Sequence, residues 1–443
     1  MRGAFRGFLL PGAVAAALLA LCAGAQARSF DVKAISETNN FNRSPVISDT
    51  GAVAWLSVHP DPEREGFSDL DVMFWKNGEL VNLRDKGASG ACSQLAVSGD
   101  EVVFVGQMPR GGATKEEEEQ KAGGQPLSPP EIALSDAQRA MEKEAPNLFL
   151  NTHANYARTQ DGEGGGEEEP PSGERKVTAA PGWDGNDVFR YDSADGTVKA
   201  LTASDHMPSF PKNGAAGATW QSARMWPYGY NIVFWDRERN EVKAVCANFY
   251  YMLAPALQGE QLVFQGWDGH DYEIYIYDVR EGVLTQITDN QFDDVMPSLW
   301  NHEVAWVAYP SLSGEIFHWN NGEIRKISTD SKENLNPQIW EGKVVWQGFD
   351  GEDSELYYFD GVRTIKLTSN TWDDVQPKFR DGLIAWMSYV GGWDAEIMAM
   401  DISDKAAVAL SENETEDRDP DTAGGKVVWQ ANGRGRSVIY LAE

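Results

Sequence analysis

The chain has 443 residues and a formal net charge of −30. This excess of carboxylates repels phosphate backbones and anionic lipids, so binding to nucleic acid and to membrane surfaces is disfavoured, and no nucleic-acid partner is expected. Cations and basic protein surfaces are favoured instead.

Residues 1–27 have the pattern of a signal peptide. Arg2 and Arg6 give a basic start, and an apolar run follows that ends in the small residues Ala25-Gln26-Ala27. The alternative is a membrane anchor, but no stop-transfer flank follows the apolar run. Past residue 27 no apolar run approaches the ~18 residues that are needed to span a bilayer. We therefore expect a periplasmic or secreted protein without an integral membrane segment after signal removal.

Two cysteines follow this segment, Cys92 and Cys246. Export permits disulfide formation, but two cysteines do not make a disulfide framework. We expect buried thiols, and the sequence leaves open whether the two pair.

Residues 32–36, "VKAIS", form an isolated segment of β character. They match "VKAL" at 198–201 and "IRKIS" at 324–328, which each end a longer repeated unit. The repeat is clearest in "LVFQGWDGHDYEIYIYD" at 262–278 and "VVWQGFDGEDSELYYFDG" at 344–361. Internal self-similarity of this kind indicates a repeat architecture.

Eight such units follow one another along the chain. Seven begin with a proline and one with Leu95, and the last five prolines are spaced by 40 to 43 residues. The prolines are Pro45, Pro208, Pro255, Pro297, Pro337, Pro377 and Pro420. Each unit also has an aromatic residue in its second segment: Trp55, Phe104, Trp220, Phe264, Trp306, Trp346, Trp386 and Trp429. We expect these rings to pack between neighbouring units.

Each unit contains four short segments rich in branched and aromatic residues. In the clearest unit they are 337–340, 343–348, 355–359 and 364–368, with Gly, Asp and Asn between them. Four strands recurring every ~40 residues are typical of a β-propeller blade. The sequence therefore predicts an all-β, eight-bladed propeller over residues 28–443, with seven blades as the alternative if the second unit is degenerate.

The second unit is interrupted by a long insertion, residues 107–183. It contains the low-complexity runs "KEEEEQ" at 115–120 and "GEGGGEEEPP" at 162–171, which predict disorder. Between them, residues 128–150 have the pattern of one amphipathic helix with prolines at its start. The insertion is interpreted either as a lid or docking arm or as a tolerated surface insertion.

The last unit ends after its third strand, at "SVIYLAE". The missing fourth strand is the isolated segment 32–36, so we expect the first strand to complete the last blade. Closure of this kind removes the exposed edge that an open sheet would present.

The strings "GHDYEIYIYD" at 269–278 and "GEDSELYYFD" at 351–360, with the proline-led first strand, resemble the repeats of TolB-type propellers. The resemblance covers nearly all of the chain after residue 27 except the insertion. It implies a propeller of the bacterial periplasm or cell surface. The usual Ser-Pro-Asp-Gly turn of that family is replaced here by tips such as "WEGK" at 340–343. The extra domain that precedes the propeller in TolB has no counterpart in this sequence.

Strand order predicts where the acidic loops point. The loops joining second to third strands, and those joining one blade to the next, share one face of a propeller. They contain the carboxylates Asp268, Asp271, Glu273, Asp293, Asp294, Asp350, Asp353, Glu355, Asp373 and Asp374. Asp-Gly is a favoured turn dipeptide, so these acids are interpreted first as turn formers. The other interpretation is coordination of a hard cation such as calcium, which takes six to eight oxygen ligands.

Aromatic residues accompany the acids in several of these loops. Trp226, Tyr228, Trp267 and Trp393 are candidates for stacking on a sugar or anchoring a protein, or else for packing at blade edges.

These features favour an exported, non-catalytic binding or scaffold propeller that presents an acidic, aromatic-rich face to a protein or glycan of the cell envelope. No residue is assigned a catalytic role. The alternative function is a polysaccharide lyase or glycoside hydrolase acting on that face with the help of a metal. We expect no cofactor, with calcium as the alternative.

Overall fold

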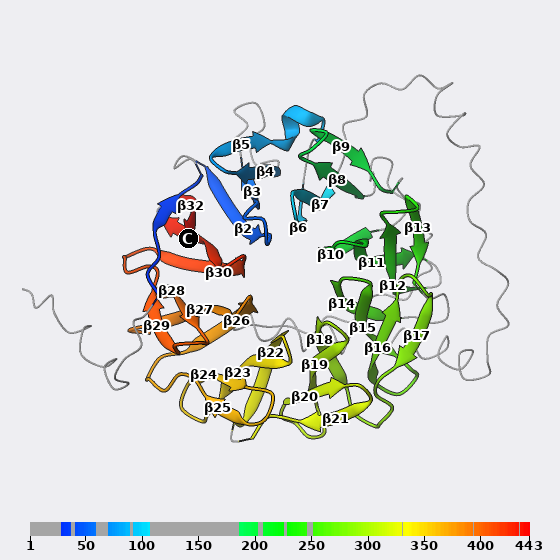
Figure 1. Cartoon of the computed structure of the whole chain (residues 1–443), viewed down its shortest axis with the longest axis vertical. Helices are drawn as coiled ribbons and strands as arrows, with labels where there is room; N and C mark the ends of the chain where they lie inside the picture. The colour runs from blue at the N-terminus through cyan, green and yellow to red at the C-terminus, as the bar shows by residue number, and fades with distance from the viewer. Residues whose placement is uncertain are drawn as a thin grey trace, which may run out of the picture.

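The computed structural model describes residues 28–36, 40–58, 70–88, 92–106, 186–202, 207–225, 228–245, 251–329, 331–392, 394–433 and 435–443. These residues form eight four-stranded antiparallel sheets arranged as a ring (Figure 1). The predicted eight-bladed propeller is therefore confirmed. Seven blades are excluded, because the second unit forms a complete sheet.

The first strand of each blade is innermost and the fourth is outermost. Blade one is β2 (Phe41–Ile47), β3 (Val53–Val58), β4 (Leu70–Lys76) and β5 (Glu79–Asn82). Blade two is β6 (Gln94–Ser98), β7 (Glu101–Gly106), β8 (Asp187–Asp192) and β9 (Thr197–Ala200). Blade three is β10 (Met207–Asn213), β11 (Gly217–Met225), β12 (Tyr228–Asp236) and β13 (Glu241–Ala244). Blade four is β14 (Met252–Gln258), β15 (Gln261–Trp267), β16 (Tyr272–Asp278) and β17 (Val283–Gln286).

The remaining blades follow the same order. Blade five is β18 (Asp294–Trp300), β19 (Glu303–Ala308), β20 (Glu315–Asn320) and β21 (Glu323–Lys326). Blade six is β22 (Glu333–Trp340), β23 (Lys343–Phe349), β24 (Ser354–Phe359) and β25 (Thr364–Lys366). Blade seven is β26 (Asp374–Arg380), β27 (Leu383–Val390), β28 (Asp394–Asp401) and β29 (Ala406–Ala409). Blade eight is β30 (Glu416–Ala423), β31 (Lys426–Gly433), β32 (Arg436–Ala442) and β1 (Val32–Ala34).

Helical structure in the described part of the chain is one 3-10 turn, η1 (Leu83–Lys86). None of the described helical segments has the length and apolar character that crossing a bilayer requires. The predicted helix at 128–150, the rest of the insertion 107–183, the signal peptide 1–27 and Cys246 lie outside the described residues. Cys92 is buried in blade two.

The aromatic residue of each second strand packs between blades, as predicted. Trp306 of blade five shares a buried cluster with Val263 and Ile274 of blade four. Trp346 likewise shares a cluster with Ala305 of blade five. Burying a ring with ~200 Å² of surface contributes roughly 5 kcal/mol at ~25 cal/mol per Å² before entropy costs. These rings therefore form the core that holds neighbouring sheets together.

Innermost strands carry a bulge in seven blades. At each bulge the register shifts and the residue before a proline has positive φ, for example Met296 at 54° and Gln376 at 52°. In blade three this residue is Phe210, so the equivalent proline is Pro211, which corrects the alignment on Pro208.

Glutamine side chains of second strands accept hydrogen bonds from bulge amides of the next blade. The pairs are Gln265 with Met296 N at 2.9 Å, Gln347 with Gln376 N at 3.3 Å, and Gln430 with Ser44 N at 3.1 Å. The glutamine of the repeated "VVWQG" string thus joins blades.

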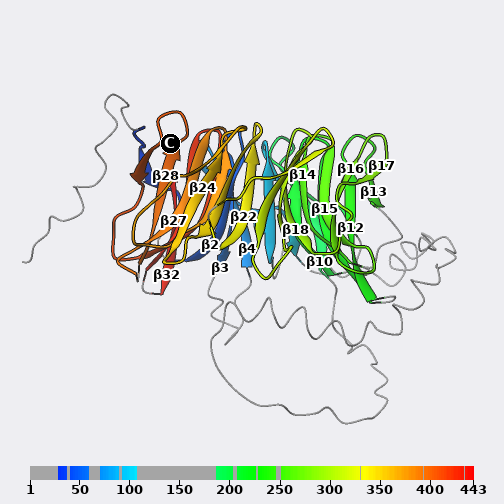
Figure 2. The same cartoon turned by 90° about the horizontal axis from the view of Figure 1, so that it is seen from below.

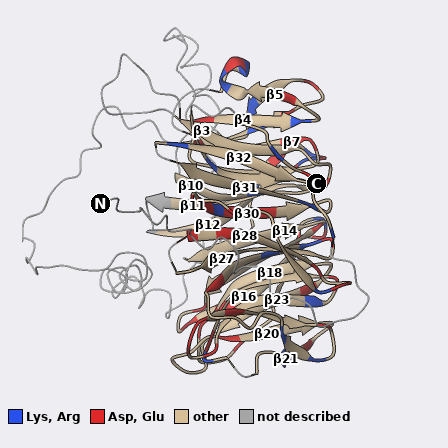
Figure 3. Cartoon of the chain, turned by 90° about the vertical axis from the view of Figure 1, so that its left-hand side faces the viewer, with Lys and Arg blue, Asp and Glu red and all other residues tan. Residues whose placement is uncertain are grey.

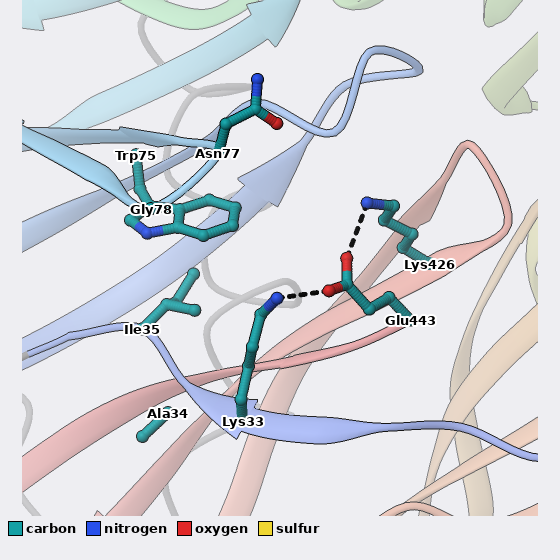
Figure 4. Close-up of a pocket in the computed structure, with 8 residues that line it drawn as sticks. All are labelled: Lys33, Ala34, Ile35, Trp75, Asn77, Gly78, Lys426 and Glu443. Carbon is teal, nitrogen blue, oxygen red and sulfur yellow. Dashed lines mark hydrogen bonds and ion pairs between the residues drawn. The ribbon is translucent and has the colours of Figure 1, made fainter.

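Ring closure takes the predicted form. Val32, Lys33 and Ala34 of β1 pair antiparallel with β32, and the Asp31 amide donates to the Glu443 carbonyl at 2.8 Å. A cavity of about 560 Å³ lies beside this junction (Figure 4).

Charged side chains reinforce the closing strand. Inside the cavity, Lys33 and Lys426 both pair with the Glu443 carboxylate, and Lys33 lies 5.6 Å from the ring centroid of Trp75 in blade one. The closing strand is therefore held by backbone pairing, ion pairs and a cation–π contact.

Candidate functional site: the loop face

One face of the ring consists of the loops between second and third strands and the loops between blades. We call the part of it formed by residues 268–271, 287–293, 309–314, 350–353, 367–373, 391–392 and 410–415 the loop face. Strands run from this face to the opposite one (Figure 2). The Tyr272 amide donates to Asp293 at 3.0 Å and the Ser354 amide donates to Asp373 at 2.8 Å. These bonds join the two kinds of loop, as the predicted strand order requires.

Two of the acidic tips are built as turns. Asp268 Oδ1 accepts from the amides of His270 at 2.8 Å and Asp271 at 3.3 Å. Asp350 Oδ1 accepts from the amides of residues 352 and 353 in the same way, at 2.8 and 3.3 Å. The first aspartate of each tip therefore fixes the backbone of its own turn.

Third-strand glutamates reach toward the next blade. Glu273 accepts from the Asn290 amide at 2.7 Å, and Glu355 accepts from the Asn370 amide at 3.0 Å. The Asn370 side chain then donates to Asp374 Oδ2 at 2.7 Å. Each chain of hydrogen bonds thus links the third strand of one blade to the first strand of the next.

The aspartate at the start of the next blade accepts the indole N–H of the buried tryptophan. Asp294 accepts from Trp306 at 2.6 Å and Asp374 accepts from Trp386 at 2.9 Å. Glu273, Asp294, Glu355 and Asp374 are at most 1% exposed. This corrects their placement on a partner-binding surface: these carboxylates satisfy buried donors, which a folded protein must do.

Sequence reasoning missed the pairing of these acceptors with tryptophan. Five blades place an indole donor opposite an Asp or Asn: Trp55–Asn42, Trp306–Asp294, Trp346–Asn334, Trp386–Asp374 and Trp429–Asp417, at 2.6 to 3.0 Å. In blade four the ring is Phe264, which has no donor, and the same register position is Met252. In these five blades the sequence carries a signal for the pairing, which is an Asp or Asn three residues before the proline of the repeat.

Burial changes the ionisation of several of these groups. It raises the pKa of Asp294 and of Asp417 to about 7, against the lowering effect of the Asn, Trp and hydroxyl donors. Burial, followed by the charges of Glu273 and Asp268, raises the pKa of Asp271 to about 6.

Buried oxygens without hydrogen-bond partners occur at both tips. Within the described residues these are both oxygens of Asp271, Oε2 of Glu273 and Oε2 of Glu355. These oxygens belong to or adjoin two carboxylate clusters, Asp268–Glu273–Asp289 in blade four and Asp350–Asp353–Glu355 in blade six. Within each cluster, one oxygen of every residue lies within 4.8 Å of those of the other two. Oxygen clusters of this size could hold a hard cation.

The predicted aromatic residues have different outcomes. Trp267 is partly buried and makes an edge contact with Tyr272, with ring centroids 5.3 Å apart. Trp226, Trp393 and the side chain of Tyr228 lie outside the described residues.

Other apolar side chains are exposed on or beside the loop face. They are Leu312 at 100%, Phe349 and Trp372 at 38% and Val390 at 40%, all in blades five to seven or between them.

Charged side chains of both signs occur on the described strands. Asp and Glu occur at many strand ends, with Lys and Arg among them (Figure 3). On this side of the ring, the acids of the described residues are distributed over several blades rather than collected in a single cluster.

Comparison with known proteins finds likenesses among solved structures. No protein-family model and no curated protein sequence matches the chain. The chain is similar to the β-propeller domain of the Trilobed protease from Pyrococcus furiosus (TM-score 0.49, 10% identity, 85% of this chain and 99% of that one). It is also similar to a prolyl endopeptidase structure (TM-score 0.50, 10% identity, 90% of this chain). The chain spans 55% of that endopeptidase.

TolB from Acinetobacter baumannii is a further match, with a TM-score of 0.35, 14% identity, and coverage of 53% of this chain and 62% of that one. The likeness to the prolyl endopeptidase, at a TM-score of 0.50 and 10% identity, shows the fold alone.

Proposed function

We propose that the chain is an exported, non-catalytic propeller with TolB-type repeats, and that its loop face binds a protein partner in the cell envelope. The observation that carries this proposal is the exposure of Leu312, Phe349, Trp372 and Val390 on or beside one face of consecutive blades. Burying exposed apolar side chains against a partner favours association by roughly 25 cal/mol per Å² of apolar surface removed from water.

The surrounding carboxylates argue for binding rather than catalysis. A glycosidase needs two carboxyl groups that can approach the scissile bond. Glu273, Glu355, Asp294 and Asp374 are buried, and each accepts hydrogen bonds from neighbouring strands or loops. Burial therefore keeps these four carboxyl groups away from a substrate bound on the loop face.

The kind of partner follows from the exposed groups and the charge. Aliphatic side chains such as Leu312 and Val390 gain most from burial in a protein pocket, whereas sugars stack on aromatic faces. A chain with a net charge of −30 attracts a partner with a basic surface. These two features support a basic protein over a glycan.

A matched pair of variants tests the proposal. In the first, Leu312, Phe349, Trp372 and Val390 are all replaced by serine. In the control, serine replaces four apolar residues of the hairpins at the opposite ends of the strands: Val242, Val283, Ile324 and Val362, which are 37 to 74% exposed. Proteins captured by the wild type from envelope extract are identified and purified, and their affinities for all three chains are measured by calorimetry.

We expect the loop-face variant to bind the partner at least ~10-fold more weakly, which corresponds to ~1.4 kcal/mol. The control should bind like the wild type, and added salt should weaken wild-type binding. Equal affinities for the three chains would overturn the proposal. Cleavage of an envelope polysaccharide by the wild type, lost in the loop-face variant, would replace it with the enzymatic alternative.

A further inference from the structure

Six blades place a carboxylate at the same position of the third strand. The position is opposite a small residue of the second strand, and its occupants are Asp71, Asp187, Glu273, Glu315, Glu355 and Glu396. A buried acid at this position needs donors or a cation to offset its loss of water. The blades differ in how they supply donors or a cation to this acid.

Five of the six acids have a partner on or just after the fourth strand of their own blade. Arg84 and Asn82 bind Asp71, Thr202 binds Asp187, Lys326 and Ser328 bind Glu315, Lys366 binds Glu355, and Ser411 binds Glu396. Glu273 accepts only the backbone amide of Asn290 among the described residues, and its Oε2 has no partner although the side chain is fully buried.

In blade six a lysine occupies the space between the tip and the third-strand acid. The Lys366 ammonium lies 2.8 Å from Asp350 and 3.2 Å from Glu355. Asp350 and Glu355 correspond to Asp268 and Glu273 of blade four. A cation at this point is therefore compatible with the blade geometry.

Blade four lacks that lysine and has an additional acid. Lys366 pairs with Tyr357, and the corresponding partner of Tyr275 is Gln286. Three residues further on, Ser369 of blade six is replaced by Asp289 in blade four.

The result in blade four is a cluster of Asp268, Glu273 and Asp289 with oxygens within 4.8 Å of one another. Asp271 lies beside it, 6% exposed and with both oxygens unpartnered. The sole ion-pair contact of this group within the described chain is the exposed His270 ring, 3.9 Å from Asp268.

We propose that blade four binds one divalent cation of the calcium type through Asp268, Glu273 and Asp289, with Asp271 completing the site. All donors are oxygens, which calcium prefers, and two ligands on opposite sides of a calcium ion lie ~4.8 Å apart. The fully buried Glu273 carboxylate, with one oxygen unpartnered, points to a ligand that the neighbouring side chains do not supply. This site is separate from the apolar residues of the docking proposal, so either proposal can fail alone.

The two blades supply the variants for the test. Gln286→Lys with Asp289→Ser gives blade four the residues of blade six, so an ammonium group replaces the metal and the fold is retained. Lys366→Gln with Ser369→Asp does the reverse in blade six. Calcium binding to the full chain is measured by calorimetry, and terbium luminescence sensitised by the neighbouring Trp267 reports on blade four.

We expect one calcium per wild-type chain, none for the blade-four double variant and two for the blade-six double variant. The thermal midpoint of the wild type should fall on adding chelator, and that of the blade-four variant should not. No binding of calcium by the wild type up to ~1 mM, the weak end for extracellular sites, would overturn the proposal. Retained binding in the blade-four variant would also overturn it.

Discussion

The indole–carboxylate hydrogen bond of blade seven makes a testable contribution to stability. Trp386 donates to Asp374 Oδ1 at 2.9 Å, Asn370 donates to Oδ2 at 2.7 Å, and both Trp386 and Asp374 are at most 1% exposed. Blade four has the apolar pair Phe264 and Met252 at these positions. We predict that Trp386→Phe and Asp374→Met each destabilise the protein and that the double substitution costs less than their sum.

The magnitudes follow from the groups left unpaired. Trp386→Phe leaves one carboxylate oxygen without its donor and a small cavity, a loss of roughly 2–4 kcal/mol. Asp374→Met leaves the indole N–H and the side-chain amide of Asn370 without acceptors, which again lowers the free energy of unfolding by roughly 2–4 kcal/mol. In the double variant the indole and its acceptor are both absent, so we expect a coupling energy of ~1–3 kcal/mol.

Guanidinium unfolding, followed by tryptophan fluorescence and far-UV circular dichroism, measures this cycle on the full chain. The control combines Trp386→Phe with Gln265→Ala, which lies three blades away and should act additively. Coupling below ~0.5 kcal/mol in the Asp374 cycle would refute the reasoning, because the hydrogen bond would then contribute nothing specific to the pair.

Three further predictions concern ionisation, closure and a pair of blades. Burial raises the pKa of Asp417 to about 7, so the native state holds a proton that the unfolded chain loses near pH ~4. The stability that this group contributes is fully present below pH ~4 and is lost as the pH rises through 7. The thermal midpoint of the wild type should therefore fall between pH ~5 and ~8, and that of Asp417→Asn should fall less. Equal falls in the two proteins would contradict the assignment. Deleting residues 28–36 exposes the edge of β32, so light scattering should detect self-association, and a monomer of unchanged thermal midpoint would contradict the closure. Arg237 binds the buried Glu101 with two bonds of 2.7 Å, so Arg237→Ala should cost ~1–3 kcal/mol in chemical unfolding and Arg237→Lys should not restore it; full rescue by lysine would refute a bidentate role.

Repetition made the fold predictable from the sequence. Eight copies of one strand pattern fixed the blade number, and an orphan strand at 32–36 identified the closure, of which Val32–Ala34 forms the paired part. The roles of the acids were harder to predict, because adjacent aspartates such as Asp293 and Asp294 are chemically identical in the sequence. Asp294 begins β18 and turns inward to the Trp306 indole, whereas Asp293 remains exposed and accepts the Tyr272 amide at the start of β16. Only the register of the strand decides between these positions.

That register also distinguishes structural acids from candidate ligands. An acid that recurs at the same position with its own donor, as Glu355 does with Lys366, stabilises the blade and needs no external partner. Blade four differs from blade six at both Asp289 and Gln286, since the first adds a negative charge and the second removes the positive charge that would balance it. Two such changes around one buried carboxylate would be destabilising unless a cation from solution offsets them. For a protein with this many carboxylates, the departures from the repeat are therefore better guides to function than the number of acids on a face.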